Sequence, residues 1–286
     1  MTRRNPPSLT CAAEKVALLG LAILGLAALA MGCDDGSPLA SGSEQLVVTG
    51  YIHAGDPASE ISVAVTLPLD ADSTLSPAVN GARVVLIRDG QSHDLELVPG
   101  DSGLYRYTGP DLIPATGDLF RLQVEYGGQL VTATTEVPPP PAGLTASAEQ
   151  LVVEADTLFL PGQFGDDDGE TLTVSWEVED DAHYLVTVES IEAGADSVES
   201  IFSRRAGSYG SRVMRDGEAV IQSRSIACYG RHEVRVYRAN EEYAELSAFR
   251  VQNLNDLAEP PSNIDGGLGL FTAFNSAAVE FEAVRP

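Results

Sequence analysis

The residues with the clearest capacity for chemistry form an acidic turn. Asp166, Asp167, Asp168 and Glu170 surround a glycine. Carboxylate oxygens are the hard ligands that Ca²⁺ prefers, but the alternating ligand positions and distal glutamate of an EF-hand are missing. These four residues are therefore candidate calcium ligands, and a solvated acidic turn is the alternative. We predict no other metal site and no cofactor.

The second candidate is a concentration of arginine. The segment from Arg204 to Arg238 holds eight arginines, whereas the segment from Pro141 to Ser200 holds 15 acids and neither lysine nor arginine. Opposite charges on neighbouring strands pair and stabilise a sheet modestly, which is one interpretation. The other is a patch that binds an anionic ligand such as a sulfated or uronic glycan or a lipopolysaccharide phosphate. That patch would consist of Arg204, Arg205, Arg212 and Arg215.

The rest of the sequence does not show residues at the spacing of a known catalytic motif. Ser92, His93 and Asp94 are adjacent within a predicted strand, so they point to opposite faces and cannot form a triad. The four histidines lie far apart, at His53, His93, His183 and His232. Lys15, the single lysine, precedes the predicted folded part, which excludes Schiff-base and P-loop chemistry there. We predict that the chain is not an enzyme; a glycan hydrolase using two acids is the less favoured alternative.

The first residues read as an export signal. Arg3, Arg4 and Lys15 precede an apolar run from Val16 to Ala30, which is typical of a secretory signal and too short to span a bilayer. Cys33 follows at the position where a bacterial lipobox places the cysteine that receives diacylglycerol. We predict a signal peptide over 1–32, a lipidated Cys33 and a flexible tether over 33–43. Cleavage after Ala28-Leu29-Ala30, which would release a soluble protein, is the alternative.

The net charge of the chain argues against one class of partner, the nucleic acids. The 286 residues contain 17 Lys+Arg against 42 Asp+Glu, for a formal charge of −25. Nucleic-acid affinity comes mainly from cations that neutralise phosphates, so we predict no nucleic-acid partner.

The segment 44–137 has the pattern of a β-sandwich. Alternating, β-branched runs at 46–52, 60–66, 82–87, 93–97, 103–107, 119–126 and 130–135 are separated by turn residues. Asp89-Gly90 and Gly127-Gly128 are strong hairpin signals. Short strands at this spacing indicate an antiparallel sandwich of immunoglobulin-like or transthyretin-like kind.

Four prolines at 138–141 cannot occupy a central strand and predict a stiff linker. The segment 142–286 is again β-rich, with strands predicted at 172–178, 183–188, 224–229 and 233–238. The strand at 224–229 would place Cys228 in the core as a small hydrophobic residue. One helix is expected, with Asn240 as N-cap and an end near Asn253. The fold class is therefore mainly β, as two antiparallel β-sandwich-like domains, the second with one short helix.

The C-terminal run from Pro260 to Phe271, PPSNIDGGLGLF, resembles the closing motif of a family of uncharacterised envelope lipoproteins of Bacteroidota-type bacteria, a domain of unknown function often encoded beside TonB-dependent receptors. Segments 46–52, 77–84 and 103–105 and the proline-rich break resemble that family too. Gly266, Gly267 and Gly269 predict a backbone with positive φ or one that crosses close to another strand.

The resemblance implies an outer-membrane lipoprotein of the cell envelope, facing the periplasm or the surface. We therefore expect a lipid-anchored binding or accessory module in outer-membrane nutrient uptake. Its expected partners are the membrane, through the anchor, and a TonB-dependent receptor or a glycan ligand. A structural or adhesive surface lipoprotein is the alternative.

Overall fold

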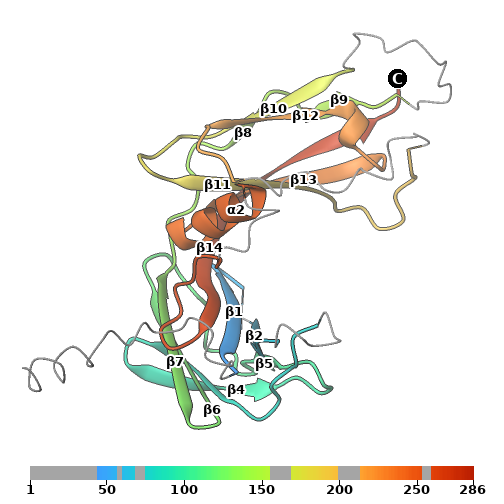
Figure 1. The fold of residues 1–286 in the computed structure, drawn as a ribbon. Helices are drawn as coiled ribbons and strands as arrows, with labels where there is room; N and C mark the ends of the chain where they lie inside the picture. Colours follow the sequence, from blue (N-terminus) through green and yellow to red (C-terminus); the bar gives the residue numbers. More distant parts are fainter. Residues whose placement is uncertain (1–43, 57–59, 68–74, 155–168, 199–212, 253–258) are drawn as a thin grey trace, which may run out of the picture. The chain divides into compact units, whose positions relative to one another are not determined.

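Strands make up most of the described chain, in accordance with the predicted mainly β fold. The structure, a computed structural model, describes residues 44–56, 60–67, 75–154, 169–198, 213–252 and 259–286. Figure 1 shows these elements in sequence colours. The predicted signal peptide, Cys33 and the tether lie outside the described residues.

All seven predicted strands of the first half are present. They are β1 (Leu46–His53), β2 (Glu60–Val65), β3 (Arg83–Arg88), β4 (Gln91–Leu97), β5 (Leu104–Arg106), β6 (Leu119–Tyr126) and β7 (Gln129–Glu136). The β3–β4 hairpin turns through Asp89 and Gly90, whose φ angles are 52° and 78°. Two positive φ angles in succession give the turn type whose twist matches that of paired strands.

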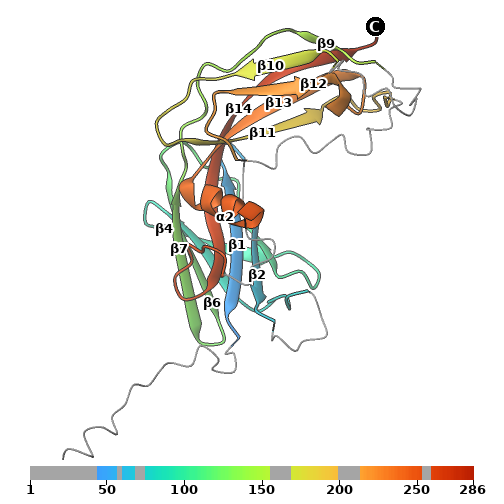
Figure 2. The ribbon, with the colours of Figure 1, turned by 45° about the horizontal axis from the view of Figure 1, so that its top comes forward.

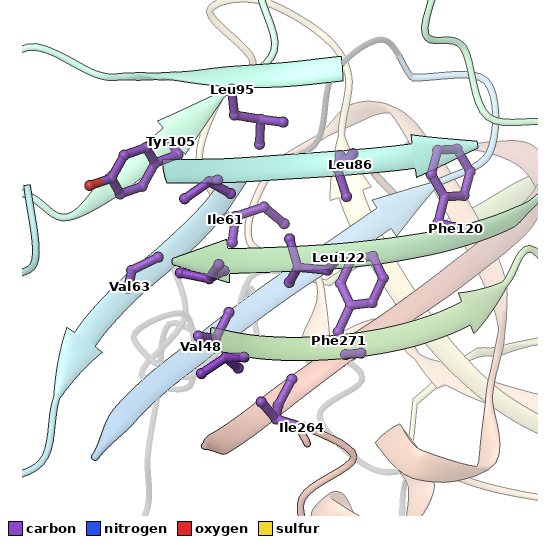
Figure 3. Packing of buried hydrophobic residues seen from close by; sticks show 14 of the residues in the cluster. Val48, Ile61, Val63, Leu86, Leu95, Tyr105, Phe120, Leu122, Ile264 and Phe271 are labelled. Carbon is purple, nitrogen blue, oxygen red and sulfur yellow. The ribbon is translucent and has the colours of Figure 1, made fainter. Parts of the chain in front are cut away.

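The first hydrophobic core takes side chains from all seven strands. β1 and β6 alternate buried and more exposed residues along their length, so one face of each supplies the core. Figure 3 shows Leu86, Leu122 and Phe271 among these side chains. Phe271 comes from the C-terminal strand, so this core is completed by residues far beyond position 137.

The second half contains shorter strands and the predicted helix. Its elements are β8 (Thr145–Ala146), β9 (Gln150–Val152), β10 (Thr171–Ser175), β11 (His183–Ser190), β12 (Glu218–Gln222), β13 (Gly230–Ala239) and α2 (Glu241–Gln252). The helix starts directly after Asn240, as predicted. The predicted strand at 224–229 is wrong: a 3₁₀ turn occupies Ser223–Ser225, and Cys228 makes only an isolated bridge to Ser197. Cys228 is unpaired and half-buried.

The C-terminal strand β14 (Leu268–Val284) belongs to both cores. Its early residues Phe271 and Ala273 lie in the first core, and Phe281 and Ala283 lie in the second, with Trp176 and Tyr184. Figures 1 and 2 show β14 running from β1 to β13.

The large sheet is mixed, which corrects the predicted antiparallel pairing, whereas the small sheet is antiparallel as predicted. The large sheet has the order β11-β13-β14-β1-β2-β5-β4-β3-β6-β7, with β9 also on β14; a small sheet has the order β12-β10-β8. β14 pairs with β1 and β9 in parallel, and the other strand pairs are antiparallel. Parallel partners distant in sequence leave no hairpin signal, so local patterns could not reveal them.

The glycine-rich closing motif behaves as predicted. Gly266 and Gly269 have φ angles of 80° and 121°. A side chain at Gly269 would collide with the carbonyl oxygen of Val48 on β1. The side chain of Asn263 then bonds both backbone polar groups of Phe271, at 2.9 Å to its N–H and 2.7 Å to its carbonyl. The motif therefore fixes the entry of β14 between its neighbours.

Candidate functional site

An open pocket of about 320 Å³ lies where four strands of the large sheet meet α2. Five elements contribute to its lining: β1, β11, β13, α2 and β14. In chain order, the lining side chains are Tyr51, His53, Leu185, Thr187, Tyr237, Tyr243 and Phe274. Four of the seven are tyrosine or phenylalanine, so we call this the aromatic pocket.

Strand alternation explains why these side chains share one face. On β1, Val48 and Ile52 enter the first core, so Tyr51 and His53 project from the other face. On β11 and β13, core residues such as Val186 alternate in the same way with the pocket residues. The aromatic pocket therefore lies on the sheet face opposite both cores.

The register brings the strand residues together. Phe274 on β14 pairs with His53 on β1 and with Ala239 on β13. Leu185 on β11 pairs with Tyr237 on β13. Figure 2 shows α2 beside β14, and the two elements are in contact. The helix contributes Tyr243 to the lining.

Phe274 is the centre of a cluster of rings. Its centroid lies 4.9 Å from that of Tyr243 and 5.3 Å from that of His53. The centroids of Tyr51 and Tyr237 lie 6.1 and 6.3 Å away. The His53 ring stacks on Phe274 at 15°, whereas Tyr237 and Tyr243 meet it nearly edge-on, at 81° and 79°. Because Phe274 is only 4% exposed, it forms the base of the pocket, and the half-buried rings surround it.

Burial favours the uncharged forms of three lining groups. It lowers the pKa of His53, and the nearby Asp56 carboxylate only partly opposes this effect. Burial also raises the pKa of Tyr237 and that of Tyr243. The pocket therefore favours a neutral imidazole at His53 and neutral phenols at Tyr237 and Tyr243.

The predicted arginine patch is only partly within the described residues. Arg204, Arg205 and Arg212 lie outside them. Arg215 pairs with Asp181 at 3.5 Å and donates to His183 Nε2 at 3.2 Å. Burial first, then the Arg215 charge, lowers the pKa of His183.

The other described arginines of this stretch also have partners. Arg231, Arg235 and Arg238 form ion pairs, and Arg224 donates to Gln222. These pairs favour the intradomain interpretation for the described part of the stretch, and the ligand patch stays a prediction.

Only one of the four candidate calcium ligands, Glu170, lies within the described residues. Asp166, Asp167 and Asp168 lie outside the described residues. The exposed Glu170 accepts a hydrogen bond from the Val152 N–H at 3.0 Å, which gives it a structural partner. Within the described ranges, no group of three or more His, Cys, Asp or Glu side chains could hold a metal ion.

The four histidines occupy separate surroundings. His53 lines the aromatic pocket, and His183 accepts from Arg215. His93 packs edge-on against Tyr107, and His232 stacks on Phe281. Sequence reasoning did not identify the aromatic pocket. The available signal was the aromatic pair Tyr51 and His53 on the face of β1 that alternation assigns to the side away from the core.

A family model for a domain of unknown function, DUF4249, matches residues 37–279. The chain belongs to this family. The match covers the first core, all of the second core except Phe281 and Ala283, and most of β14, so it includes every residue that lines the aromatic pocket. The resemblance noted at the closing motif is thereby confirmed at the level of the domain.

Other comparisons add little to the DUF4249 assignment. No curated protein matches the sequence. The solved structure titled "Crystal structure of Salmonella alpha-2-macroglobulin mutant Y1175G" is similar at 12% identity with a TM-score of 0.24. The similarity covers 86% of this chain and 15% of that one. In the part of the chain that the structure describes, no helix has the length and apolarity needed to cross a membrane.

Proposed function

We propose that this DUF4249 chain is a lipid-anchored binding protein of the cell envelope that holds a small ligand in the aromatic pocket. The pocket is the observation that supports this function. Its volume is at the lower end of the range for small-molecule sites, and its lining is mostly apolar with a few hydroxyl groups. Phe274 and Tyr243 come from elements that must be folded together, so the pocket forms only in the complete protein.

The anchoring part of the proposal rests on the N-terminal sequence. A basic start, an apolar run and Cys33 follow one another in the order of a lipoprotein signal. Two or more acyl chains give stable membrane attachment. The resemblance to envelope lipoproteins encoded beside TonB-dependent receptors extends the proposal to an accessory role in nutrient uptake at the outer membrane.

Binding without chemical conversion is the form of function that the lining favours. The acid–base groups of the lining are His53, whose ring stacks on Phe274, and three tyrosine hydroxyls. A glycosidase needs two carboxyl groups flanking the scissile bond, and no lining residue carries one. We therefore propose a binding protein and not an enzyme.

The anchor is tested in a bacterial host that expresses the full chain with its own leader. Metabolic labelling with a tagged fatty acid should mark the wild type and not Cys33→Ala, and the variant should leave the membrane fraction. A mature N-terminus at Met31 without acyl label would overturn the anchor and support cleavage after Ala30.

The binding site is tested with the same full chain purified in a non-ionic detergent. Saturation-transfer NMR is recorded against a panel of glucose, galactose, indole, benzoate and choline. At least one compound should give a signal that Tyr243→Ala abolishes. Tyr126→Ala is the matched control, because Tyr126 is 40% exposed on the β6–β7 hairpin, outside the pocket. No signal from any compound, or equal signals in Tyr243→Ala, would overturn the proposed function and favour a structural role.

A further inference from the structure

We infer that the aromatic pocket binds a compact organic cation, specifically a methylated ammonium group held against the tyrosine rings. This inference names the ligand class of the site proposed above and rests on that proposal. Three properties of the pocket lead to it: the number of rings around one point, the absence of charge in the lining, and the charge of the whole protein.

The rings provide the attraction. A cation interacts favourably with an aromatic face within about 6 Å of the ring centroid. Tyr51, Tyr237 and Tyr243 have centroids within 6.3 Å of that of Phe274, and Tyr51 and Tyr243 lie 6.5 Å apart and nearly perpendicular. A group small enough to enter this pocket therefore meets several rings at once.

The lining contains no competing positive charge. His53 is the single lining side chain that could become cationic, and burial lowers its pKa, which favours the neutral ring at pH 7. The charge of Asp56 raises the pKa of His53, and the charges of Glu189 and Glu233 raise that of Tyr237. Acidic groups therefore lie near the site.

Two arginines are also close to the lining. The charge of Arg235 lowers the pKa of Tyr237, but Arg235 is paired with Glu233 at 2.6 Å. The charge of Arg250 lowers the pKa of Tyr243, and Arg250 is exposed on the last turn of α2. Around them, the whole chain has a formal charge of −25, which attracts cations at long range and repels anions.

Sugars and anions suit the lining less well. A sugar carries several hydroxyl groups, and each one buried without a partner opposes binding. The pocket offers no amide, carboxylate or guanidinium group, and Thr187 and Tyr237 already hydrogen-bond to each other. An anion would find no cationic side chain in the lining to pair with. A methylated ammonium group needs few hydrogen bonds and is attracted to aromatic rings.

The test compares two ligands of nearly the same shape and different charge. Choline and its uncharged isostere 3,3-dimethyl-1-butanol are titrated into the full-length protein by NMR. Choline should bind at least about tenfold more tightly, as expected when one or two rings contribute cation–π energy. Equal affinity for the two compounds would overturn the cation inference and leave the pocket as a neutral binding site. Binding of neither compound, with another panel compound bound at Tyr243, would also overturn it while the proposed function stands.

Substitutions of Tyr243 distinguish the contribution of its aromatic face from that of its apolar volume. Tyr243→Phe keeps the face, and Tyr243→Leu keeps an apolar side chain without it. Choline affinity should change less than about threefold in Tyr243→Phe and fall about tenfold in Tyr243→Leu, whereas affinity for the isostere should be similar in both. Tyr126→Leu is the control outside the pocket. Equal choline affinity in the Tyr243→Phe and Tyr243→Leu proteins would contradict the inference.

Discussion

The side-chain amide of Asn240 donates a hydrogen bond to Thr135 Oγ1 at 2.9 Å, across 105 positions of sequence. The same amide donates to the carbonyl of Glu136 at 2.9 Å. The Thr135 hydroxyl in turn donates to Glu242 Oε1 at 3.2 Å. These hydrogen bonds hold the first turn of α2 against β7. Tyr243, which lines the aromatic pocket, lies in the same turn.

Replacement of Asn240 with alanine should lower the free energy of unfolding by about 1–2 kcal/mol, because two hydrogen bonds are lost, one part-buried and one exposed. Urea denaturation of the purified protein measures this change. Gln129→Ala is the control, since Gln129 makes one exposed hydrogen bond to the Glu44 carbonyl. Its cost should stay below about 0.5 kcal/mol. Equal costs for the two variants would show that the α2–β7 contact does not contribute to stability.

The close approach of β14 to β1 gives a second prediction. Gly269→Ala should lower the free energy of unfolding by about 2–5 kcal/mol, because φ is 121° and the new methyl group would meet backbone atoms of Val48. Gly117→Ala is the matched control, with φ of 82° and open space around it. Its cost should be about 1–2 kcal/mol. A similar melting temperature for both variants would contradict this account of the closing motif.

Two ion pairs of the arginine-rich stretch should differ in strength. Arg238 pairs with Glu179 at 2.6 Å and its side chain is 17% exposed, whereas Arg231 pairs with Glu280 at 2.5 Å and is 63% exposed. Arg238→Gln should cost about 1–2 kcal/mol of unfolding free energy, because a largely buried guanidinium loses its contact with Glu179, which is itself 52% exposed. Arg231→Gln should cost less than about 1 kcal/mol.

Salt separates the two arginine variants further. At about 1 M NaCl the cost of Arg231→Gln should disappear, because exposed charges are screened over a few ångströms. The cost of Arg238→Gln should largely persist. Urea titrations at low and high salt measure both values, and the reverse order of costs would be inconsistent with the burial of Arg238.

His53 predicts a pH dependence of stability. Burial lowers its pKa in the folded protein below the ordinary value of 6.5, so the unfolded chain takes up the proton first as pH falls. The contribution of His53 to stability is therefore present above pH 6.5 and is lost as pH falls toward the folded pKa. His53→Gln should lose less stability than wild type between about pH 7.5 and pH 5.5.

The comparison with His53→Gln cancels the other titrating groups, including His183, whose pKa is also lowered. Protonated His53 would also place a positive charge beside the aromatic pocket. Choline affinity should therefore fall over the same pH interval in the wild type and stay nearly constant in His53→Gln. Parallel pH profiles for the two proteins would remove His53 from both effects.

Local patterns predicted the parts of the fold that are local in origin. The Asp89-Gly90 turn and the alternation along β6 depend on neighbouring residues alone, and both were predicted correctly. The α2 helix was predicted from Asn240 and its apolar spacing. The strand expected at 224–229 failed because Ser223–Ser225 form a 3₁₀ turn within an otherwise β-like run.

The aromatic pocket could not be predicted in this way. Its residues come from five elements, and the pairing of His53 with Phe274 joins positions more than 200 residues apart. Tyr237 and Tyr243 each fit an ordinary role, as a strand residue and a helix residue. Only the register of β1, β14 and β13 shows that their rings gather at one place.

The pairing of β1 with β14 sets the order in which the protein can be completed during synthesis. Val47 pairs with Leu268, so β1 waits for 221 further residues before its parallel neighbour exists. At ribosomal speeds of about 5–20 residues per second, this delay is roughly 10–45 s. Throughout it, one edge of β1 has no partner strand, which is the condition under which strands associate with other chains. We expect chaperones to bind such a nascent chain until β14 is made. Loss of the last twenty residues would remove β14 from both hydrophobic cores.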